Sequence, residues 1–163
     1  LSAASEGSLV TLDNLSLAVN QFALSANGQV TTTGDYPLDV LLTLNATDIV
    51  EENDIAAEFK LTNSLEQLFV NATIDDAIDA SIAGVVKPLE PDLPVELGVE
   101  WDAIGWPLDN PSTALSENAR IDISGTLDDY HVTLNTRLSG EQIPDTRIEL
   151  AGKANTQLEP AYE

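Results

Sequence analysis

The side chains that could carry out acid–base chemistry are one histidine and several adjacent carboxylates. His131 is the single histidine, and adjacent acids occur at Glu51-Glu52, Asp75-Asp76 and Asp128-Asp129. Two carboxylates in suitable geometry can hydrolyse a glycoside. With 28 acidic residues in 163, however, adjacent pairs are expected by chance. All three pairs also fall at predicted turns, which Asp favours because it hydrogen-bonds its own backbone. The pairs therefore indicate turns rather than an active site.

No motif for a nucleophile, cofactor or metal accompanies these residues. The sequence lacks Gly-x-Ser-x-Gly, Gly-x-Gly-x-x-Gly, a phosphate loop with lysine and an Asp-x-Asp-x-Asp-Gly calcium loop. It has no cysteine, which excludes disulfides and thiolate metal sites. A lone histidine on the polar face of a strand is typical of a surface residue. We therefore predict a protein that is not an enzyme and that needs no cofactor or metal.

The net charge of the chain limits the kinds of molecule that it is expected to bind. Six basic residues stand against 28 acidic ones, a net charge of −22. Such a surface repels phosphate backbones, so we expect no nucleic-acid binding. It also disfavours lying flat on an anionic bilayer. The simplest role for the acidic surface is solubility.

Apolar and polar residues alternate along most of the chain, which is typical of β-strands with one apolar face. The clearest case is a hairpin about Asp128-Asp129, whose stripes run from Ile121 to Leu127 and from Tyr130 to Leu138. Further stripes run over residues 38–44, 68–74, 78–86 and 95–101, and residues 9–24 and 147–155 are similar but weaker. The sequence predicts an all-β fold.

Turn signals separate these stripes at intervals of roughly 8–12 residues, the rhythm of an all-β chain. They lie at Asn27-Gly28, Gly34-Asp35, Glu52-Asn53-Asp54, Pro88 to Pro94 and Asp109-Asn110-Pro111. Residues 63–67 are predicted to form at most one helical turn. A weak repeat, in which a turn is followed by a tyrosine and a strand at Tyr36 and Tyr130, favours a stacked, quasi-one-dimensional β architecture over a closed sandwich. The sequence does not settle which strands are neighbours.

We expect residues 1–163 to form a single β-rich segment. The prolines of residues 88–94 cannot donate to a sheet ladder. This connector therefore suggests a subdivision into 1–87 and 95–163, although an ordinary long loop would explain it equally well.

Several motifs in the second half of the chain resemble the TamB family, the inner-membrane subunit of the translocation and assembly module, related to AsmA-like proteins. The resemblance is strongest over residues 84–152 and extends loosely to 36–40. The residues that carry it most specifically are Trp101, Trp106, Pro107, Leu108, Gly125 and Tyr130.

The resemblance implies a fold, a location and partners. Family members are long periplasmic proteins of Gram-negative bacteria, anchored in the inner membrane by an N-terminal helix. Their strands curl into an open half-pipe with an apolar concave face. They are implicated in moving phospholipid between the two membranes and in outer-membrane biogenesis with an outer-membrane barrel partner. By this resemblance, the chain is expected to be an internal stretch of the wall, without the anchor or the barrel-docking region.

On this hypothesis the apolar stripes line a groove that shields phospholipid acyl chains. The residues predicted to line it are Leu38, Val40, Leu42, Leu44, Val70, Ile74, Ile78, Ile82, Val95, Leu97, Val99, Trp101, Ile121, Ile123, Leu127, Tyr130, Val132, Leu134 and Leu138.

Two other functions fit the same pattern. The segment could be a scaffold or chaperone for outer-membrane proteins such as autotransporters, taking up their strands by β-augmentation. It could also be a closed β-sandwich whose stripes are its own core, which is the usual fate of alternating strands. The arrangement of the apolar faces, around a groove or a solid core, separates these readings.

Overall fold

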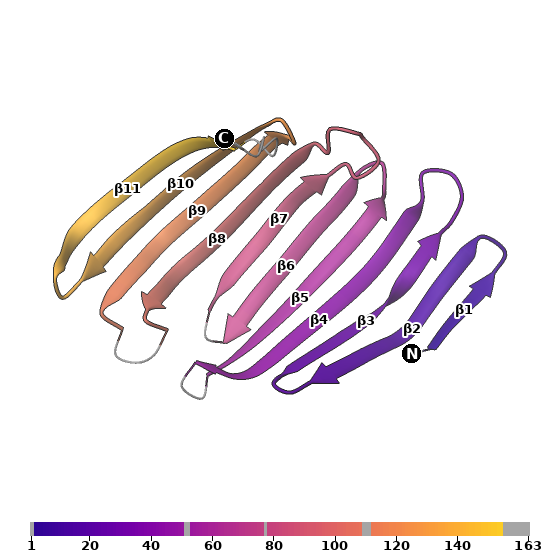
Figure 1. Cartoon of the computed structure of the whole chain (residues 1–163), viewed down its shortest axis with the longest axis horizontal. Helices are drawn as coiled ribbons and strands as arrows, with labels where there is room; N and C mark the ends of the chain where they lie inside the picture. The colour runs from indigo at the N-terminus through magenta and orange to yellow at the C-terminus, as the bar shows by residue number, and fades with distance from the viewer. Residues whose placement is uncertain (1, 51–52, 77, 109–111, 155–163) are drawn as a thin grey trace, which may run out of the picture.

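The computed structural model describes residues 2–50, 53–76, 78–108 and 112–154. Within these ranges eleven β-strands form one antiparallel sheet, and their order in the sheet is their order in the chain (Figure 1). The strands are β1 Ser2–Glu6, β2 Leu9–Val19, β3 Phe22–Thr31, β4 Pro37–Val50, β5 Asn53–Ser64, β6 Leu68–Asp76, β7 Ala80–Val86, β8 Val95–Trp106, β9 Ala114–Thr126, β10 Asp129–Gly140 and β11 Ile143–Ala154.

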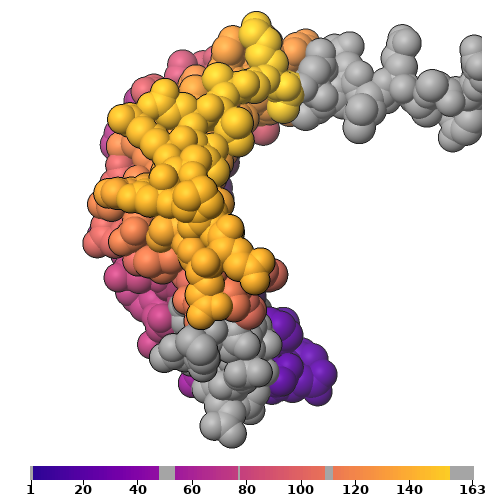
Figure 2. Space-filling view, turned by 90° about the vertical axis from the view of Figure 1, so that its left-hand side faces the viewer, coloured from indigo at the N-terminus to yellow at the C-terminus, as the bar shows by residue number. Residues whose placement is uncertain are grey.

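The sheet is open and strongly curved. β1 pairs only with β2, and β11 pairs only with β10, so over the described part of the chain the sheet has two free edges. Viewed along the direction in which the strands stack, the molecule has the outline of a C (Figure 2). The long central strands therefore follow the curve of the C, from the side of one tip towards the other. We call the edge at which the odd-numbered strands end the first rim, and the edge at which the even-numbered strands end the second rim.

The sheet encloses no core of its own. Among the described residues, the buried apolar side chains are all alanines, namely Ala26, Ala46, Ala57, Ala72, Ala80 and Ala119. The larger apolar side chains keep part of their surface accessible, and several are more than half exposed. A closed β-sandwich would bury these side chains between two sheets. The closed-sandwich alternative is therefore wrong for this chain, and the expected open half-pipe is confirmed.

Two glycines allow adjacent strands to approach unusually closely. A Cβ on Gly84 in β7 would lie 2.0 Å from the carbonyl oxygen of Glu96 in β8. A Cβ on Gly28 in β3 would lie 2.3 Å from the carbonyl oxygen of Asp39 in β4, and Gly28 has a φ of 152°. Neither position has room for a side chain. Glycines at such points permit sharp local bending of a sheet.

The structure corrects two local predictions. Asn27-Gly28 is not a turn: both residues lie inside β3, and the β2–β3 turn is formed by Asn20 and Gln21. Residues 63–67 are not helical either. Asn63 and Ser64 end β5, and residues 65–67 form a bend that the Asn63 side-chain amide closes with a 2.8 Å hydrogen bond to the Gln67 carbonyl oxygen. Asn63 has a positive φ of 83°, which asparagine tolerates better than most residues do.

The other predicted turns are reported where the structure describes them. Turns at Gly34-Asp35 and at Asp128 are confirmed. Asp76 ends β6, so the second acidic pair lies at a strand end. Residues 51–52 and 109–111 lie outside the described residues. The proline-rich connector 88–94 joins β7 to β8, and these strands pair directly from Ala80–Trp101 to Val86–Val95, so the sheet runs on across the connector.

Candidate functional site

The strand register aligns apolar residues in rows that cross the whole sheet. The central row has one residue from each strand from β2 to β11, and every one of them is apolar. Its members are Leu15, Ala26, Leu42, Phe59, Ala72, Ile82, Val99, Ile121, Leu134 and Leu150.

A second row lies next to the first on the side of the first rim. It is two residues away along each strand from β3 to β11 and three residues away along β2, where the pairing with β3 is irregular. It combines aliphatic residues with three glycines, so we call it the glycine row. Its members are Leu12, Gly28, Val40, Leu61, Val70, Gly84, Leu97, Ile123, Val132 and Gly152. A third row, towards the second rim, comprises Leu17, Leu24, Leu44, Ala57, Ile74, Ala80, Trp101 and Ala119.

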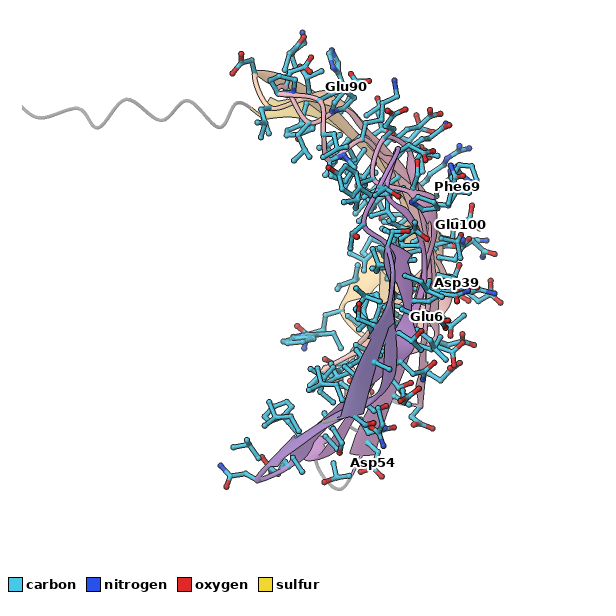
Figure 3. All side chains as sticks on the ribbon, turned by 90° about the vertical axis from the view of Figure 1, so that its right-hand side faces the viewer. Glu6, Asp39, Asp54, Phe69, Glu90 and Glu100 are labelled. Carbon is cyan, nitrogen blue, oxygen red and sulfur yellow. The ribbon has the colours of Figure 1, made fainter. Side chains whose placement is uncertain are left out.

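These rows face the inside of the C. Asp39, Phe69 and Glu100 point outward from the convex side (Figure 3). Because successive side chains of a strand point to opposite faces, the residues beside them along the chain, Val40, Val70 and Trp101, face the concave side. The paired convex row is polar almost throughout: Ser16, Ser25, Thr43, Glu58, Thr73, Ser81, Glu100, Arg120, Asn135 and Glu149.

The structure brings most of the predicted lining residues together in these rows. Leu38, Val95 and Tyr130 lie in a fourth row, nearest the first rim. Three residues lie elsewhere. Ile78 precedes β7, Leu127 lies in the β9–β10 turn, and Leu138 lies beyond the irregularity in the pairing of β10 with β9. Among the motif residues, Gly125 pairs with Val95 and Tyr130, whereas Trp106 ends β8 with 68% of its surface exposed, followed by Pro107 and Leu108.

One strand of the concave face, β5, was not among the strands predicted from the sequence. β5 contributes Phe59 and Leu61 to the two longest apolar rows. The signal was present in the alternation of Ile55, Ala57, Phe59 and Leu61 with polar or small neighbours.

A short chain of hydrogen bonds interrupts the apolar surface. The indole Nε1 of Trp101 donates to the Ser116 hydroxyl at 3.1 Å. That hydroxyl lies 2.7 Å from the hydroxyl of Thr136, which also lies 3.4 Å from the Glu117 carbonyl oxygen. These partly buried groups satisfy one another, so the indole N–H is not left unpaired on an apolar face. Nearer the first rim, the Tyr130 hydroxyl donates to the Leu93 carbonyl oxygen at 3.2 Å and ties the connector to the sheet.

Charged residues occupy the opposite face and the rims. Arg120 forms ion pairs with Glu100 and Asp122, and Arg137 pairs with Asp145. Hydrogen bonds from these arginines hold the pKa values of Asp122 and Asp145 below the ordinary carboxyl value. Arg147, Lys87 and Lys153 also pair with acids, at 2.8, 3.0 and 3.1 Å.

The described residues form no cluster suited to binding a metal ion, since they contain no group of three or more His, Asp or Glu placed to hold one. His131 lies on the convex side, one residue from Val132, with its Nδ1 4.0 Å from Asp129. A surface hollow of about 580 Å³ is lined by polar side chains of β9 to β11 and is open to solvent. Over the described part of the chain, no helix is long and apolar enough to cross a membrane.

Comparison with known proteins bears out the resemblance seen in the sequence. The model of the TamB N-terminal domain matches residues 1–158, well beyond the range over which the motifs were strongest. No solved structure matches the chain. TamB-family proteins are envelope proteins with transport and assembly roles rather than enzymes. The chain belongs to the TamB family, and its match is to the N-terminal domain of that family.

Proposed function

We propose that the concave face of this sheet is a groove that shields phospholipid acyl chains as they pass between the inner and outer membranes. The observation that supports this most directly is the continuity of the apolar rows, which cross the sheet from β2 to β11 without a polar residue in the central row.

The energetics suit such cargo. Each CH₂ group that leaves water for an apolar surface contributes about 0.8 kcal/mol. Eleven strands spaced about 4.8 Å apart make a groove on the order of 48 Å long, running along the stacking direction. A lipid can slide along such a surface, because neighbouring strands present similar aliphatic side chains and no single position holds it.

The wider setting follows from the same proposal. The segment would work in the periplasm as part of a parent protein anchored in the inner membrane. Other regions of that parent would reach the outer-membrane barrel partner of the assembly module. No residue of this segment would act as a catalyst, and no cofactor would be needed.

The experiment compares two neighbouring residues that lie on opposite faces of β6. Val70→Glu places a charge in the glycine row, and Phe69→Glu places the same charge on the convex face. Lipid that co-purifies with each variant would be extracted and quantified by mass spectrometry. We expect Val70→Glu to reduce bound phospholipid several-fold, because a carboxylate in an apolar groove is strongly disfavoured, whereas Phe69→Glu should retain it.

The two variants also provide the control for folding. Both should keep the strand signal in circular dichroism, since neither position lies in a closed core. If neither the unmodified protein nor Phe69→Glu carries phospholipid, the groove function is wrong. If Val70→Glu retains as much phospholipid as Phe69→Glu, the acyl chains do not lie on the concave face.

A second candidate function is a scaffold for outer-membrane proteins. The free edges of β1 and β11 favour it, since each offers unpaired backbone groups to an added strand. Photo-crosslinkers placed in β1 or β11 should then capture unfolded barrel proteins, whereas crosslinkers in the central row should not. The lipid-groove proposal predicts the reverse pattern, with lipid adducts in the central row.

A further inference from the structure

The groove leaves only one place for a lipid headgroup. The concave rows are apolar, so a phosphate-bearing headgroup would lose its hydration there without gaining partners. It must therefore stay in water at the opening of the C, between the first and second rims. The charge of the side chains on the two rims then determines which headgroup is favoured there.

Both rims carry mainly negative charge. On the first rim, acidic residues lie in or beside the connections that follow the odd-numbered strands from β3 to β9. They are Asp35, Glu66, Glu90, Asp92, Asp128 and Asp129. On the second rim, the described acidic residues are Asp54, Asp75, Asp76, Asp79 and Glu141. Glu90 and Asp54 mark the two tips of the C (Figure 3).

The nearby basic residues do not offset this charge. Lys87 is engaged by Glu90 at 3.0 Å, and Lys153 by Asp129 at 3.1 Å, both at the first rim. Arg137, near the second rim, is held by Asp145. A headgroup phosphate at the opening would therefore meet carboxylates or cations that already have a carboxylate partner.

Resting on the groove function proposed above, we propose that the rims select phospholipids by headgroup charge. They favour a headgroup with an exposed ammonium group, as in phosphatidylethanolamine, and disfavour one with net negative charge, as in phosphatidylglycerol. The ammonium group can pair with rim carboxylates and compensate its own phosphate, whereas an anionic headgroup is repelled from both sides of the opening. The Debye length is about 8 Å at physiological ionic strength, so the rims act on the headgroup more strongly than the distant convex face does.

The test offers both lipids to the protein at once. The purified chain would be incubated with vesicles of equal phosphatidylethanolamine and phosphatidylglycerol with identical acyl chains, in 0.15 M salt and a chelator that removes divalent cations. Lipid bound to the re-isolated protein would be quantified by mass spectrometry. We expect an enrichment of phosphatidylethanolamine on the order of five-fold, falling towards one at 1 M salt, where the Debye length is about 3 Å.

Two charge-matched variants locate the effect. The rim variant combines Glu66→Gln, Asp76→Asn and Asp79→Asn, and the convex variant combines Asp39→Asn, Glu58→Gln and Glu96→Gln. Each removes three carboxylates. The rim variant should lose most of the enrichment, and the convex variant should keep it.

The outcomes separate this inference from the groove function. Bound lipid in the donor ratio, or equal enrichment in the rim variant and the unmodified protein, would overturn headgroup selection and leave the groove function standing. Loss of enrichment in the convex variant to the same degree would also overturn it, since net charge alone would then be responsible. If no lipid of either kind is bound, the groove function fails, and the selection fails with it.

Discussion

The indole N–H of Trp101 is hydrogen-bonded to the Ser116 hydroxyl across the β8–β9 pair, on the face of the sheet that is otherwise apolar. The Thr136 hydroxyl of β10 lies within hydrogen-bond distance of the Ser116 hydroxyl, so the hydrogen-bonded series includes side chains from three adjacent strands. These hydrogen bonds let the Trp101 side chain lie in the groove without an unsatisfied donor. They also link β8, β9 and β10 where the β9–β10 register is irregular.

Ser116→Ala should destabilise the protein by about 0.5–1.5 kcal/mol, because it leaves the Trp101 donor without its partner. The free energy of unfolding would be measured by urea titration followed by circular dichroism. Ser124→Ala, on the exposed face of the same strand, is the control and should stay within about 0.5 kcal/mol of the unmodified protein. In a cycle with Trp101→Phe, the two effects should be less than additive, and strict additivity would contradict the proposed coupling.

Gly84→Ala should destabilise the sheet by about 1–3 kcal/mol, because its Cβ would meet the backbone of β8 at 2.0 Å. Gly152 occupies the same row at the β11 edge, and a Cβ there meets no atom within 4 Å. Gly152→Ala should therefore be nearly neutral. Thermal unfolding of both variants checks this, and equal losses of stability would show that close strand approach at Gly84 is not what requires glycine.

Asp122→Asn should lower stability near neutral pH by a small amount that disappears in acid. Its hydrogen bond from Arg120 lowers the pKa of Asp122 in the folded protein below the ordinary value of 3.8. The ionised carboxylate therefore stabilises the folded state above pH 3.8, and this contribution is lost as the pH falls through the lowered folded pKa. Melting temperatures of both proteins measured from pH 7 to pH 2 should converge below pH 3.8. A difference that persists at pH 2 would show that the asparagine acts by another route.

Removing the β10–β11 hairpin should leave the other strands folded. Each strand pairs only with its neighbours in the chain, so the loss of two terminal strands removes a single interface with β9. A chain ending at residue 127 should retain its strand signal per residue in circular dichroism and its hydrogen-exchange protection in β4 to β7. Collapse of protection throughout would indicate a sheet that folds only as a whole.

The sequence predicted the elements with the most regular alternation. The hairpin of β9 and β10 contains the predicted stripes from Ile121 to Leu138, because most polar residues there mark the convex face. The weak repeat indicated stacked strands but not which strands are neighbours, and the sequential order is known only from the structure. The family resemblance supplied what alternation could not, namely that the apolar face stays open.

Other features depend on information that a local pattern lacks. Asn27-Gly28 has the composition of a turn, yet Gly28 pairs with Val40 inside the sheet. Glycine is needed there because β3 and β4 lie too close together for a side chain. The strand containing Phe59 was missed because a strongly acidic stretch precedes it. Curvature depends on how neighbouring strands pack, so no stripe predicts it by itself. For the same reason, the rim carboxylates were interpreted only as turn residues and solubilising charge.

The strictly sequential strand order has an evolutionary consequence. A duplicated or deleted hairpin changes the length of the groove by two strand spacings, about 10 Å, and leaves its cross-section unchanged. Each connection joins two strands that are neighbours in the sheet, so such a change requires no rerouting elsewhere. Relatives with grooves of different length could therefore arise by copying hairpins, while the apolar concave surface stays the same.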